Sequence, residues 1–467
     1  MRPPVRSSRL VAGLIYATLT SAVVSSLGML LVPTISREFD VALSSAQWML
    51  TINLLVGAVA TPVMGRLSDG PHKRRLLLVS LAVIFAGSVA AALAPNFAVF
   101  LVGRAMQGLT YGIAPVTIAI ARRYLSESRA KPAISSLSVT VATGIGVGYP
   151  LTGILASVLG FRAAFWFSAI FVVSAAAVVW RVLPSGADLR APRVRFDYVG
   201  AVLLGAGTST FLLVVAESAA WGWTTPKALA CIVTAVVALS AWVRYELRVE
   251  NPLINVRVLS NGDVLLANSA AVGLGIALYI GVSIASLIAQ SPVSTGYGVE
   301  LPLLWAGFVM LPLSVGSFGA NRIVRIAAKR ITIAALLPLG AAVLTASVCM
   351  LWLDHDDLGL ILVGMFMFGV GTGMTYAAMP GLIARNVVVA ELGSAVSFNQ
   401  VLRTMGGAFG AAVAGAVLAA HRAADLHPTD AGIAQALLTG FVCSTVVFVA
   451  LTANHVRRRR VSAVGAE

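Results

Sequence analysis

Apolar runs of about 20 residues recur along the whole chain and are separated by short polar segments. An α-helix rises 1.5 Å per residue, so a run of this length crosses the roughly 30 Å hydrocarbon core of a bilayer. The pattern therefore predicts an all-α polytopic membrane protein with fourteen transmembrane helices. Their expected bounds are 11–32, 46–65, 76–94, 98–121, 133–157, 163–180, 199–217, 226–243, 264–289, 301–321, 331–352, 358–384, 394–419 and 433–452.

The composition agrees with this pattern. Of the 467 residues, 58% are hydrophobic and 11% are charged. A soluble domain carries about 25% charged residues, so this chain has too few charges to cover a water-facing surface. The first apolar run is longer than the roughly 7–15 residues of a secretory signal, and further spans follow it. We expect it to be an uncleaved first span.

The net charge of +15 has two explanations, nucleic-acid binding or the collection of basic residues in cytoplasmic loops. With a cytoplasmic N-terminus, the inside segments hold 27 of the 33 Lys and Arg, the outside segments hold four, and two fall within spans. Such asymmetry is typical of a multi-pass protein of the cell (inner or plasma) membrane. It predicts that both termini are cytoplasmic and argues against a nucleic-acid partner.

Two long polar segments, 181–198 and 244–263, divide the spans into six, two and six. We expect an N-terminal six-helix bundle over 1–183, a two-helix insert over 184–258 and a C-terminal six-helix bundle over 259–467. The outer sixes share a glycine-rich stretch followed by proline and arginine, at Gly108 to Arg122 and at Gly369 to Arg385. Paired halves that handle a substrate between them are typical of transporters.

The loop after the second span places one acid, Asp69, between Gly65 and the basic residues Lys73, Arg74 and Arg75. It can be an ordinary basic loop with a helix-ending glycine. It can also be a gating loop, in which Asp69 pairs in one state only with a basic residue at the end of the fourth span, Arg122 or Arg123. Its pattern, G-x-L-x-D-x-x-x-[KR]-[KR], resembles the signature loop of the major facilitator superfamily.

The fourth span contains Arg104, Gln107 and Gly108, which are similar to the superfamily's R-x-x-Q-G segment. A cation about 10 Å inside the span costs at least about 2.5 kcal/mol unless it finds a partner or reaches the interface. Arg104 can therefore snorkel outward. The resemblance instead implies a place in the transport pathway, near the proton route of exporters.

The fifth span is rich in glycine and contains a proline, a composition that permits close approach of helices and bends the axis. It resembles the antiporter motif of drug–proton exchangers but departs from it at Tyr149 and Ile154. A packing face alone and a direct role in preventing leak both stay open. The residues of this helix-packing motif are Gly144, Gly146, Gly148, Pro150 and Gly153.

The insert and the thirteenth span resemble the fourteen-span drug:proton antiporter group, through Phe196 to Gly200, Glu250 to Leu253 and Glu391 to Gly407. Arg403 lies about 14 Å into its span, where a polar residue usually faces a cavity or another helix. We expect it to contact an anionic substrate group or a mobile counter-ion, or to anchor neighbouring helices. The predicted lining of a largely apolar central cavity is Trp48, Asn53, Tyr111, Asn399, Gln400 and Arg403.

The group usually carries an aspartate in the first span, where this chain has Val24, and an asparagine where it has Met29. Proton coupling needs a group that titrates during the cycle, usually a buried carboxylate. No Asp or Glu lies deep within a predicted span, which leaves Asp69, Glu217 and Asp263 as second-choice proton carriers. Proton antiport and uncoupled uniport or exchange therefore both stay open.

Other function classes find less support. The chain lacks the G-x-x-x-x-G-K-[ST] phosphate-binding loop, and its histidines and isolated cysteines show no metal-ligand spacing within a span. The outer-loop segment 354–357 is expected to be a solvated acidic loop rather than a metal site. We expect no enzyme, cofactor or metal, but a monomeric secondary transporter that exports amphipathic or lipophilic small molecules, with protons as a further possible partner. A lipid exporter and a non-transporting scaffold or sensor are the alternatives.

Overall fold

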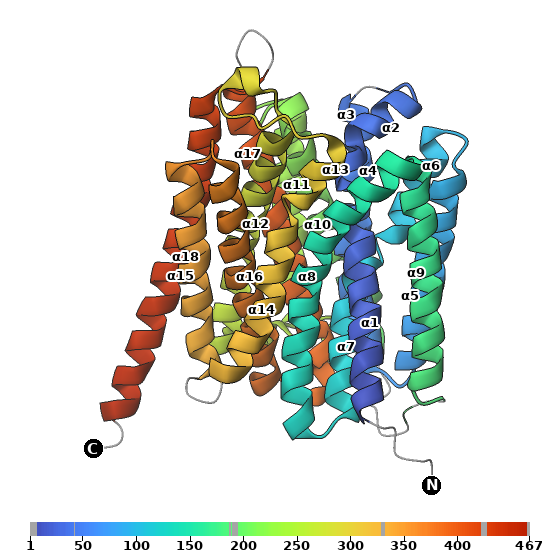
Figure 1. The fold of residues 1–467 in the computed structure, drawn as a ribbon. Helices are drawn as coiled ribbons and strands as arrows, with labels where there is room; N and C mark the ends of the chain where they lie inside the picture. The colour runs from blue at the N-terminus through green and yellow to red at the C-terminus, as the bar shows by residue number, and fades with distance from the viewer. Residues whose placement is uncertain are drawn as a thin grey trace.

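The computed structural model describes residues 7–41, 43–185, 188, 195–327, 332–421 and 427–464. Fourteen helical segments in these ranges are long and apolar enough to cross a membrane. They run side by side through the molecule (Figure 1). The predicted all-α fold class and number of spans are confirmed. Helix α1 begins and α18 ends at the same face, which we call the terminal face; the other is the opposite face (Figure 1).

The first six spans form one group of packed helices. Helix α1 packs against α7, α8 and α9, and α5 packs against α6 and α9. The elements of this group are α1 (Ser7–Ser26), η1 (Met29–Leu31), α2 (Val32–Glu38), α3 (Leu43–Ala46), α4 (Trp48–Asp69), α5 (Lys73–Leu93), α6 (Phe97–Gln107), α7 (Thr110–Tyr124), α8 (Glu127–Leu159) and α9 (Phe161–Val182).

Spans seven and eight are the helices α10 (Tyr198–Trp221) and α11 (Pro226–Glu246). Helix α10 packs against α11 and also against α4 and α17, so it contacts both groups of six. Helix α11 carries a row of valines, Val233, Val236 and Val237, that are each more than half exposed. An exposed apolar face of this kind fits the hydrocarbon of a bilayer.

The last six spans form the second group. Helix α12 packs closely against α17, and α16 packs against α14 and α15. The elements are η2 (Val256–Ser260), α12 (Gly262–Gln290), η3 (Val293–Thr295), α13 (Leu303–Phe308), α14 (Leu311–Ala327), α15 (Ile333–Leu353), α16 (Leu358–Asn386), η4 (Val389–Glu391), α17 (Leu392–Ala420) and α18 (Asp430–Val464).

Three expected spans contain a break. The first is interrupted at Gly28, whose φ of +97° lies in the left-handed region that glycine adopts without strain. The fourth divides into α6 and α7 at Gly108, where an added Cβ would lie 2.8 Å from the Asn53 carbonyl oxygen of α4. The tenth divides into α13 and α14. Hydropathy is continuous across these points, so the apolar pattern could not show the breaks.

The two groups meet along two seams. One joins α4 to α17, and the other joins α8 to α13, α14 and α16. The residues discussed below lie at these seams and in the space that they enclose.

Candidate functional site

A small cavity lies between the two groups of helices. Its walls come from α1, α7 and α8 on one side and from α12, α16 and α17 on the other. Its volume is about 40 Å³, whereas pockets for drug-sized molecules have roughly 300–1,000 Å³. It must therefore widen before it holds such a molecule. The lining residues are Ser21, Ala22, Ser25, Thr110, Tyr111, Ala114, Val141, Ile145, Tyr279, Tyr376, Gln400, Arg403 and Thr404.

Arg403 is the charged residue of this lining. It is 7% exposed, and its Nη2 donates a hydrogen bond to Gln400 Oε1 one turn earlier on α17. Its guanidinium carbon lies 3.9 Å from the centre of the Tyr376 ring, in a cation–π contact. Within the described part of the chain, no carboxylate lies within ion-pair distance of Arg403.

Glycines bring α12 and α17 together beside Arg403. An added Cβ at Gly275 of α12 would lie 2.6 Å from the Arg403 carbonyl oxygen, so the two backbones are in contact there. An added Cβ at Gly407 would lie 2.4 Å from the Tyr279 ring. Tyr279 thus packs over a glycine of α17 and reaches the cavity.

A second, apolar cavity adjoins the first and shares Ile145 and Tyr279 with it. It includes Met29, beyond the break of the first span, and Tyr149, whose hydroxyl lies 3.0 Å from the Met29 sulfur. The remaining lining residues are Ala142, Leu278, Val282, Leu313 and Thr372. The two cavities together extend the central space toward the opposite face.

At the terminal face, Asp69 joins the two groups of helices. It ends α4, is 2% exposed, and accepts hydrogen bonds from the backbone N–H of Gly393 (2.7 Å) and Ser394 (3.1 Å). These N–H groups open α17, where the helix dipole also favours a negative charge. An added Cβ at Gly65 would lie 2.7 Å from the Gly393 carbonyl oxygen, so small residues permit this approach.

The pairing of Asp69 with Arg122 or Arg123, predicted for one state only, is not formed in this conformation. Arg123 instead forms an ion pair with Asp188 of the insert, with Nε 2.5 Å from Oδ2. The Asp188 backbone N–H donates to the Pro71 carbonyl at 3.0 Å, which fastens the insert to the loop after α4. The carboxylate of Asp69 takes α17 as its partner because that helix start offers two free N–H groups at the seam.

Other basic residues of the predicted gating loop make their hydrogen bonds within the first group of helices. Lys73 Nζ donates to the Gly70 carbonyl at 2.5 Å and to that of Asp69 at 3.4 Å, so it caps the end of α4. Arg74 Nη2 donates to the Trp180 carbonyl near the end of α9. Arg122 makes no contact with Asp69 among the described residues.

The glycines of the helix-packing motif in α8 lie on two faces of the helix, which contact different groups of helices. Added Cβ atoms at Gly144 and Gly148 would meet Ala22 and Ser26 of α1, in the same group of helices. Added Cβ atoms at Gly146 and Gly153 would instead meet Ser314 of α14 and Leu303 of α13, in the other group.

The second of these faces closes the α8 seam. Ser314 Oγ donates to the Thr143 carbonyl at 2.7 Å. Pro150 also faces this seam, because its Cα lies 3.0 Å from the position of a Cβ on Gly307. The contacts toward Leu303 lie at the opposite face, so the central space is narrow at both ends.

Arg104 is 1% exposed and does not line the cavity. Its Nη1 donates to Gln107 Oε1 at 2.6 Å, and its Nε donates to the Met49 carbonyl at 3.2 Å. Nη1 also lies 3.4 Å from the Leu27 carbonyl, where the first span breaks. Arg104 thus joins three spans inside the protein and does not snorkel outward.

Several other residues of the expected pathway also lie outside the lining. Asn53 Nδ2 donates to the Arg104 carbonyl at 3.1 Å, and Gln107 Nε2 donates to Ser88 Oγ at 2.8 Å. Asn399 Nδ2 donates to the Ala267 carbonyl of α12 at 3.0 Å. Trp48 is the half-buried first residue of α4. Of the expected pathway residues, the cavity brings together Tyr111, Gln400 and Arg403.

The carboxyl groups that are buried in the described residues lie away from the cavity. They are those of Asp69, Asp197 and Glu246. Glu246 Oε1 accepts from Trp242 Nε1 at 2.8 Å, and a Cβ added at Gly200 would lie close to both Glu246 and Asp197. Asp197 and Glu246 belong to the insert, and sequence reasoning did not single them out as candidates.

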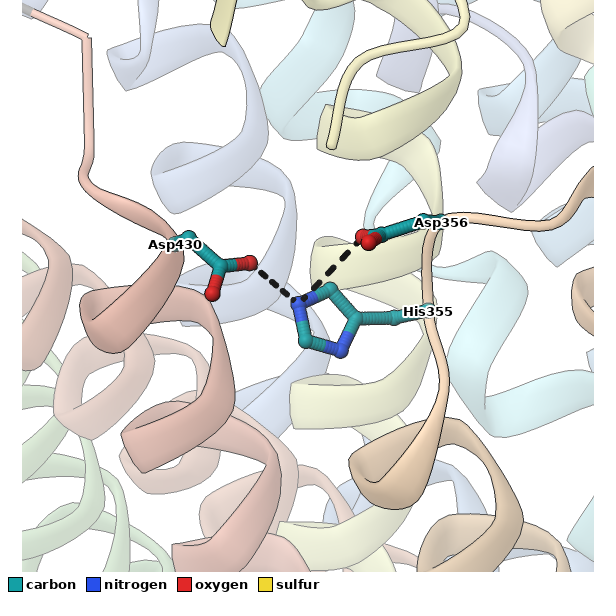
Figure 2. Close-up of side chains that lie close together, drawn as sticks. All are labelled: His355, Asp356 and Asp430. Atoms are coloured by element: carbon teal, nitrogen blue, oxygen red, sulfur yellow. Dashed lines mark hydrogen bonds and ion pairs between the residues drawn. The ribbon is translucent and has the colours of Figure 1, made fainter. Parts of the chain in front are cut away.

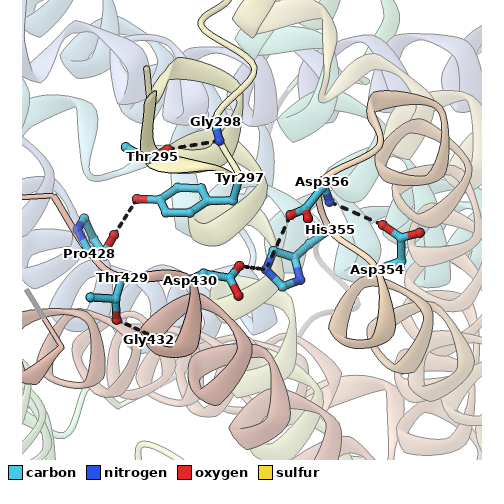
Figure 3. Close-up of polar contacts among 10 residues, drawn as sticks. All are labelled: Thr295, Tyr297, Gly298, Asp354, His355, Asp356, Pro428, Thr429, Asp430 and Gly432. Atoms are coloured by element: carbon cyan, nitrogen blue, oxygen red, sulfur yellow. Dashed lines mark hydrogen bonds and ion pairs between the residues drawn. The ribbon is translucent and has the colours of Figure 1, made fainter. Parts of the chain in front are cut away.

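At the opposite face, His355 and two aspartates lie close together (Figure 2). His355 is 7% exposed, and its Nε2 lies 2.8 Å from Asp430 Oδ1 and 3.9 Å from Asp356 Oδ1. Asp430 opens α18, and next to it the Pro428 carbonyl accepts a hydrogen bond from the Tyr297 hydroxyl at 2.9 Å (Figure 3).

The aspartates of the predicted solvated loop, Asp354, Asp356 and Asp357, are exposed, whereas His355 between them is buried. Three loops of the second group, those around residues 297, 355 and 430, are tied together by the hydrogen bonds of His355 and Tyr297 (Figure 3). The three ligand atoms lie within 4.8 Å of one another, which is compatible with a metal ion. Sequence reasoning missed Asp430 because it lies 75 positions from His355 and has no recognisable spacing to it.

Comparison with known proteins gives the family. The chain matches the model described as Major Facilitator Superfamily over residues 13–411. It is 26% identical over 399 residues to the multidrug resistance protein Stp of Mycobacterium tuberculosis (strain ATCC 25618 / H37Rv), covering 85% of this chain and 73% of that protein. It is 26% identical over 410 residues to the tetracenomycin C resistance and export protein of Streptomyces glaucescens, with the same coverage of 85% and 73%.

The fold is also similar to a solved structure. It matches the human organic anion transporter MFSD10 (TETRAN) with a TM-score of 0.66, covering 96% of this chain and 100% of that chain. The identity is 16%, so this likeness concerns the fold alone. The family model takes in most of the 467 residues, and the predicted resemblance is confirmed. The chain belongs to the Major Facilitator Superfamily of membrane transporters.

Proposed function

We propose that the protein exports amphipathic or lipophilic small molecules across the cell membrane by alternating access. The bundles 1–183 and 259–467 rock against each other, and the insert 184–258 covers the α4–α17 seam from outside. The observation that carries the proposal is a central cavity whose walls come from both groups of helices and which is narrow at both faces. Opening one seam while the other stays closed would expose the cavity to one side at a time.

The orientation follows from the charge distribution. The inside segments hold 27 of the 33 Lys and Arg when the terminal face is cytoplasmic. On this proposal Asp69 closes the cytoplasmic side and the α8–α13 contact closes the outer side. The relatives named for multidrug resistance and tetracenomycin export support an outward direction and a chemically broad substrate range.

The composition of the cavity lining bears on the energy source. Asp or Glu is absent from the described lining of either cavity, and Val24 stands in the first span where the antiporter group carries an acid. The described lining residues therefore offer no carboxylate that could carry a proton through the cavity, as proton antiport usually requires. Uniport or substrate exchange is the alternative favoured by this observation, with Asp69, Glu217 and Asp263 as the second-choice proton carriers if antiport operates.

Disulfide cross-links test alternating access directly. Ser68→Cys with Gly393→Cys spans the α4–α17 seam, where an added Cβ at Gly393 would lie 2.1 Å from Ser68 Oγ. Gly153→Cys with Leu304→Cys spans the α8–α13 seam, with 3.4 Å between an added Cβ and the Leu304 Cα. Both pairs are therefore in direct contact, and the helices need to move apart slightly to accommodate the roughly 3.5–4.5 Å between the Cβ atoms of a disulfide. The native cysteines Cys231, Cys349 and Cys443 would first be replaced.

The matched control is a pair within one bundle, Gly13→Cys with Val178→Cys, where the added Cβ would lie 3.4 Å from Val178 Cγ1. We expect oxidation of either seam pair to stop efflux from cells or vesicles, and reduction to restore it. The control pair should transport under both conditions. Continued efflux with both seam pairs fully cross-linked would exclude alternating access between these bundles.

A further inference from the structure

The central space carries one unbalanced charge. Among the described residues that line the two adjoining cavities, Arg403 is the one with a formally charged side chain. No described carboxylate lies within ion-pair distance of it. A buried cation without a counter-ion is unfavourable in a low-dielectric site and is retained in membrane proteins mainly where it has a function. The negative charge that the site lacks can arrive with the substrate.

The geometry of Arg403 leaves it able to bind an anion. A guanidinium carries five N–H donors, and the recorded side-chain hydrogen bond of Arg403, to Gln400, uses one of them. The Tyr376 ring covers the guanidinium, and the side chain belongs to the cavity lining. The planar group can therefore present two parallel N–H donors to a carboxylate, sulfonate or phenolate oxygen.

Arg104 shows what a structural arginine looks like in the same protein. It is also buried, but its donors are directed at Gln107 Oε1 and at the carbonyls of Met49 and Leu27. It lies outside both cavities. Arg403 differs in its position and in its hydrogen bonding. It lines the cavity, and among the described side chains Gln400 is its one hydrogen-bond acceptor.

Aromatic side chains surround the unbalanced charge. Tyr111, Tyr279 and Tyr376 line the central cavity, and Tyr149 lines the apolar one. They come from α7, α12, α16 and α8, so both groups of helices contribute rings. Tyrosines offer flat apolar faces for stacking and a hydroxyl at the edge for hydrogen bonding. A flat aromatic molecule suits this lining.

We propose that the cavity takes aromatic small molecules that carry an anionic group. The oxygens of that group bind Arg403, the rings lie among Tyr111, Tyr279 and Tyr376, and the apolar remainder extends along the second cavity. Lipophilic cations are disfavoured because Arg403 repels them and the described lining offers no acid to attract them. This inference rests on the proposed transport function and narrows its substrate class.

A matched pair of probes tests the charge preference. 1-Anilinonaphthalene-8-sulfonate and N-phenyl-1-naphthylamine share one aromatic skeleton, and only the first carries an anionic group. Tetraphenylphosphonium supplies an aromatic cation. Equilibrium dialysis against the purified full-length protein in nanodiscs, with protein-free nanodiscs as blank, measures the binding of each. We expect the sulfonate to bind at least about tenfold more tightly than the neutral amine, and the cation to bind most weakly.

Substitutions of Arg403 test whether this residue causes the preference for the anionic probe. Arg403→Met should weaken sulfonate binding at least about tenfold and leave neutral-amine binding within about twofold, so that the preference disappears. Arg403→Lys keeps the charge without the planar fork and should retain part of the preference. The neutral amine reports an intact cavity in each variant. If Arg403→Met does not fold, the wild-type preference and Arg403→Lys still decide the matter.

Two results would overturn the inference. One is wild-type protein that binds the neutral amine or the cation at least as tightly as the sulfonate. The other is a sulfonate preference that survives in Arg403→Met. Transport of the three probes in proteoliposomes shows whether only the inferred substrate class is wrong or the proposed export function as well. Flux of the amine or cation without the sulfonate overturns the substrate class alone, whereas absence of flux for all three overturns the exporter itself.

Discussion

Arg104 and Arg403 lie away from the ends of membrane-spanning helices, and they are bound in different ways. Arg104 is buried among acceptors of its own bundle, on α4, α6 and the broken first span. Arg403 faces a cavity between the bundles and stacks on Tyr376. A charge in a membrane helix is costly unless such partners are present. The same residue type therefore joins helices of one bundle in one place and, on the proposal above, binds a substrate in the other.

Arg104→Met should destabilise the N-terminal bundle. The change leaves the Leu27 and Met49 carbonyls and the Gln107 amide without the guanidinium, and each orphaned acceptor costs about 1–3 kcal/mol. We expect a lower midpoint of thermal unfolding in detergent and less monodisperse protein. Arg129→Met, at an exposed arginine, is the control and should leave the midpoint unchanged. Equal midpoints for both variants would show that Arg104 is not an anchor.

Asp69→Asn should slow transport while leaving the amount of folded protein unchanged. The carboxylate accepts two N–H bonds at the start of α17, and an amide offers one oxygen and no charge. Closure of the terminal face should weaken by about 1–3 kcal/mol, or roughly 5- to 150-fold in the open–closed equilibrium. Uptake into everted vesicles, in which an exporter moves its substrate inward, measures the effect, with expression followed in parallel. Uptake at the wild-type rate would mean that Asp69 does not hold this face closed.

The sequence located Asp69 but not its partner. An acid alone among basic residues is visible in the chain, and the gating-loop pattern marks it. The groups that bind it are backbone N–H groups 324 and 325 positions away, which carry no side-chain signal. Tyr279 and Tyr376 were missed for a related reason, because an aromatic residue in an apolar span looks the same whether it faces lipid or a cavity.

At the scale of elements, α8 is held between two partners by glycines on two of its faces. Gly144 and Gly148 allow contact with α1 within the bundle, and Gly146 and Gly153 allow contact with α14 and α13 across the seam. The spacing of four residues within the first pair keeps both on one side of the helix. One helix can therefore be fixed to its own bundle while it separates from the other.

Two valine substitutions in α8 distinguish these faces. At Gly148 an added Cβ would lie 1.9 Å from Ser26 Oγ, so Gly148→Val should disturb the N-terminal bundle and lower the midpoint of thermal unfolding. At Gly146 it would lie 2.3 Å from Ser314 Oγ, so Gly146→Val should leave the midpoint near that of wild type but impair closure of the seam. Transport should fall in both. The reverse order of thermal midpoints would contradict this assignment of faces.

Element positions were largely predictable from hydropathy, whereas breaks within them were not. The expected second span 46–65 corresponds to α4, and 394–419 to α17. The interruptions at Gly28 and Gly108 depend on a left-handed backbone and on the approach of another helix. Neither changes the apolar character of the run, so only the three-dimensional packing shows them.

At the scale of the whole molecule, two bundles enclose a central space and the insert covers one seam. Helix α10 packs against both α4 and α17, and Trp242 of α11 lies 5.6 Å from Phe398 of α17 between ring centres. The insert therefore contacts both sides of the α4–α17 seam. It must therefore slide on at least one of them if that seam opens.

The energy source is also a property of the whole molecule, because it depends on the net charge that one transport cycle moves across the membrane. If the substrate is an anion held by Arg403, an inside-negative membrane potential drives it outward without a proton carrier, at about 2.3 kcal/mol per 100 mV for each charge moved. A cavity whose described lining lacks a carboxylate is compatible with that route.

Flux through the reconstituted protein tests the transport function most directly. Wild-type protein and the oxidised Ser68→Cys/Gly393→Cys variant are placed in liposomes, with 1-anilinonaphthalene-8-sulfonate, N-phenyl-1-naphthylamine and tetraphenylphosphonium as test compounds. A membrane potential or a pH gradient is then imposed. We expect wild-type flux of the sulfonate that follows the potential, ignores the pH gradient and stops in the cross-linked variant. Absence of protein-dependent flux for all three compounds, under either gradient, would contradict the assignment of this chain as an exporter.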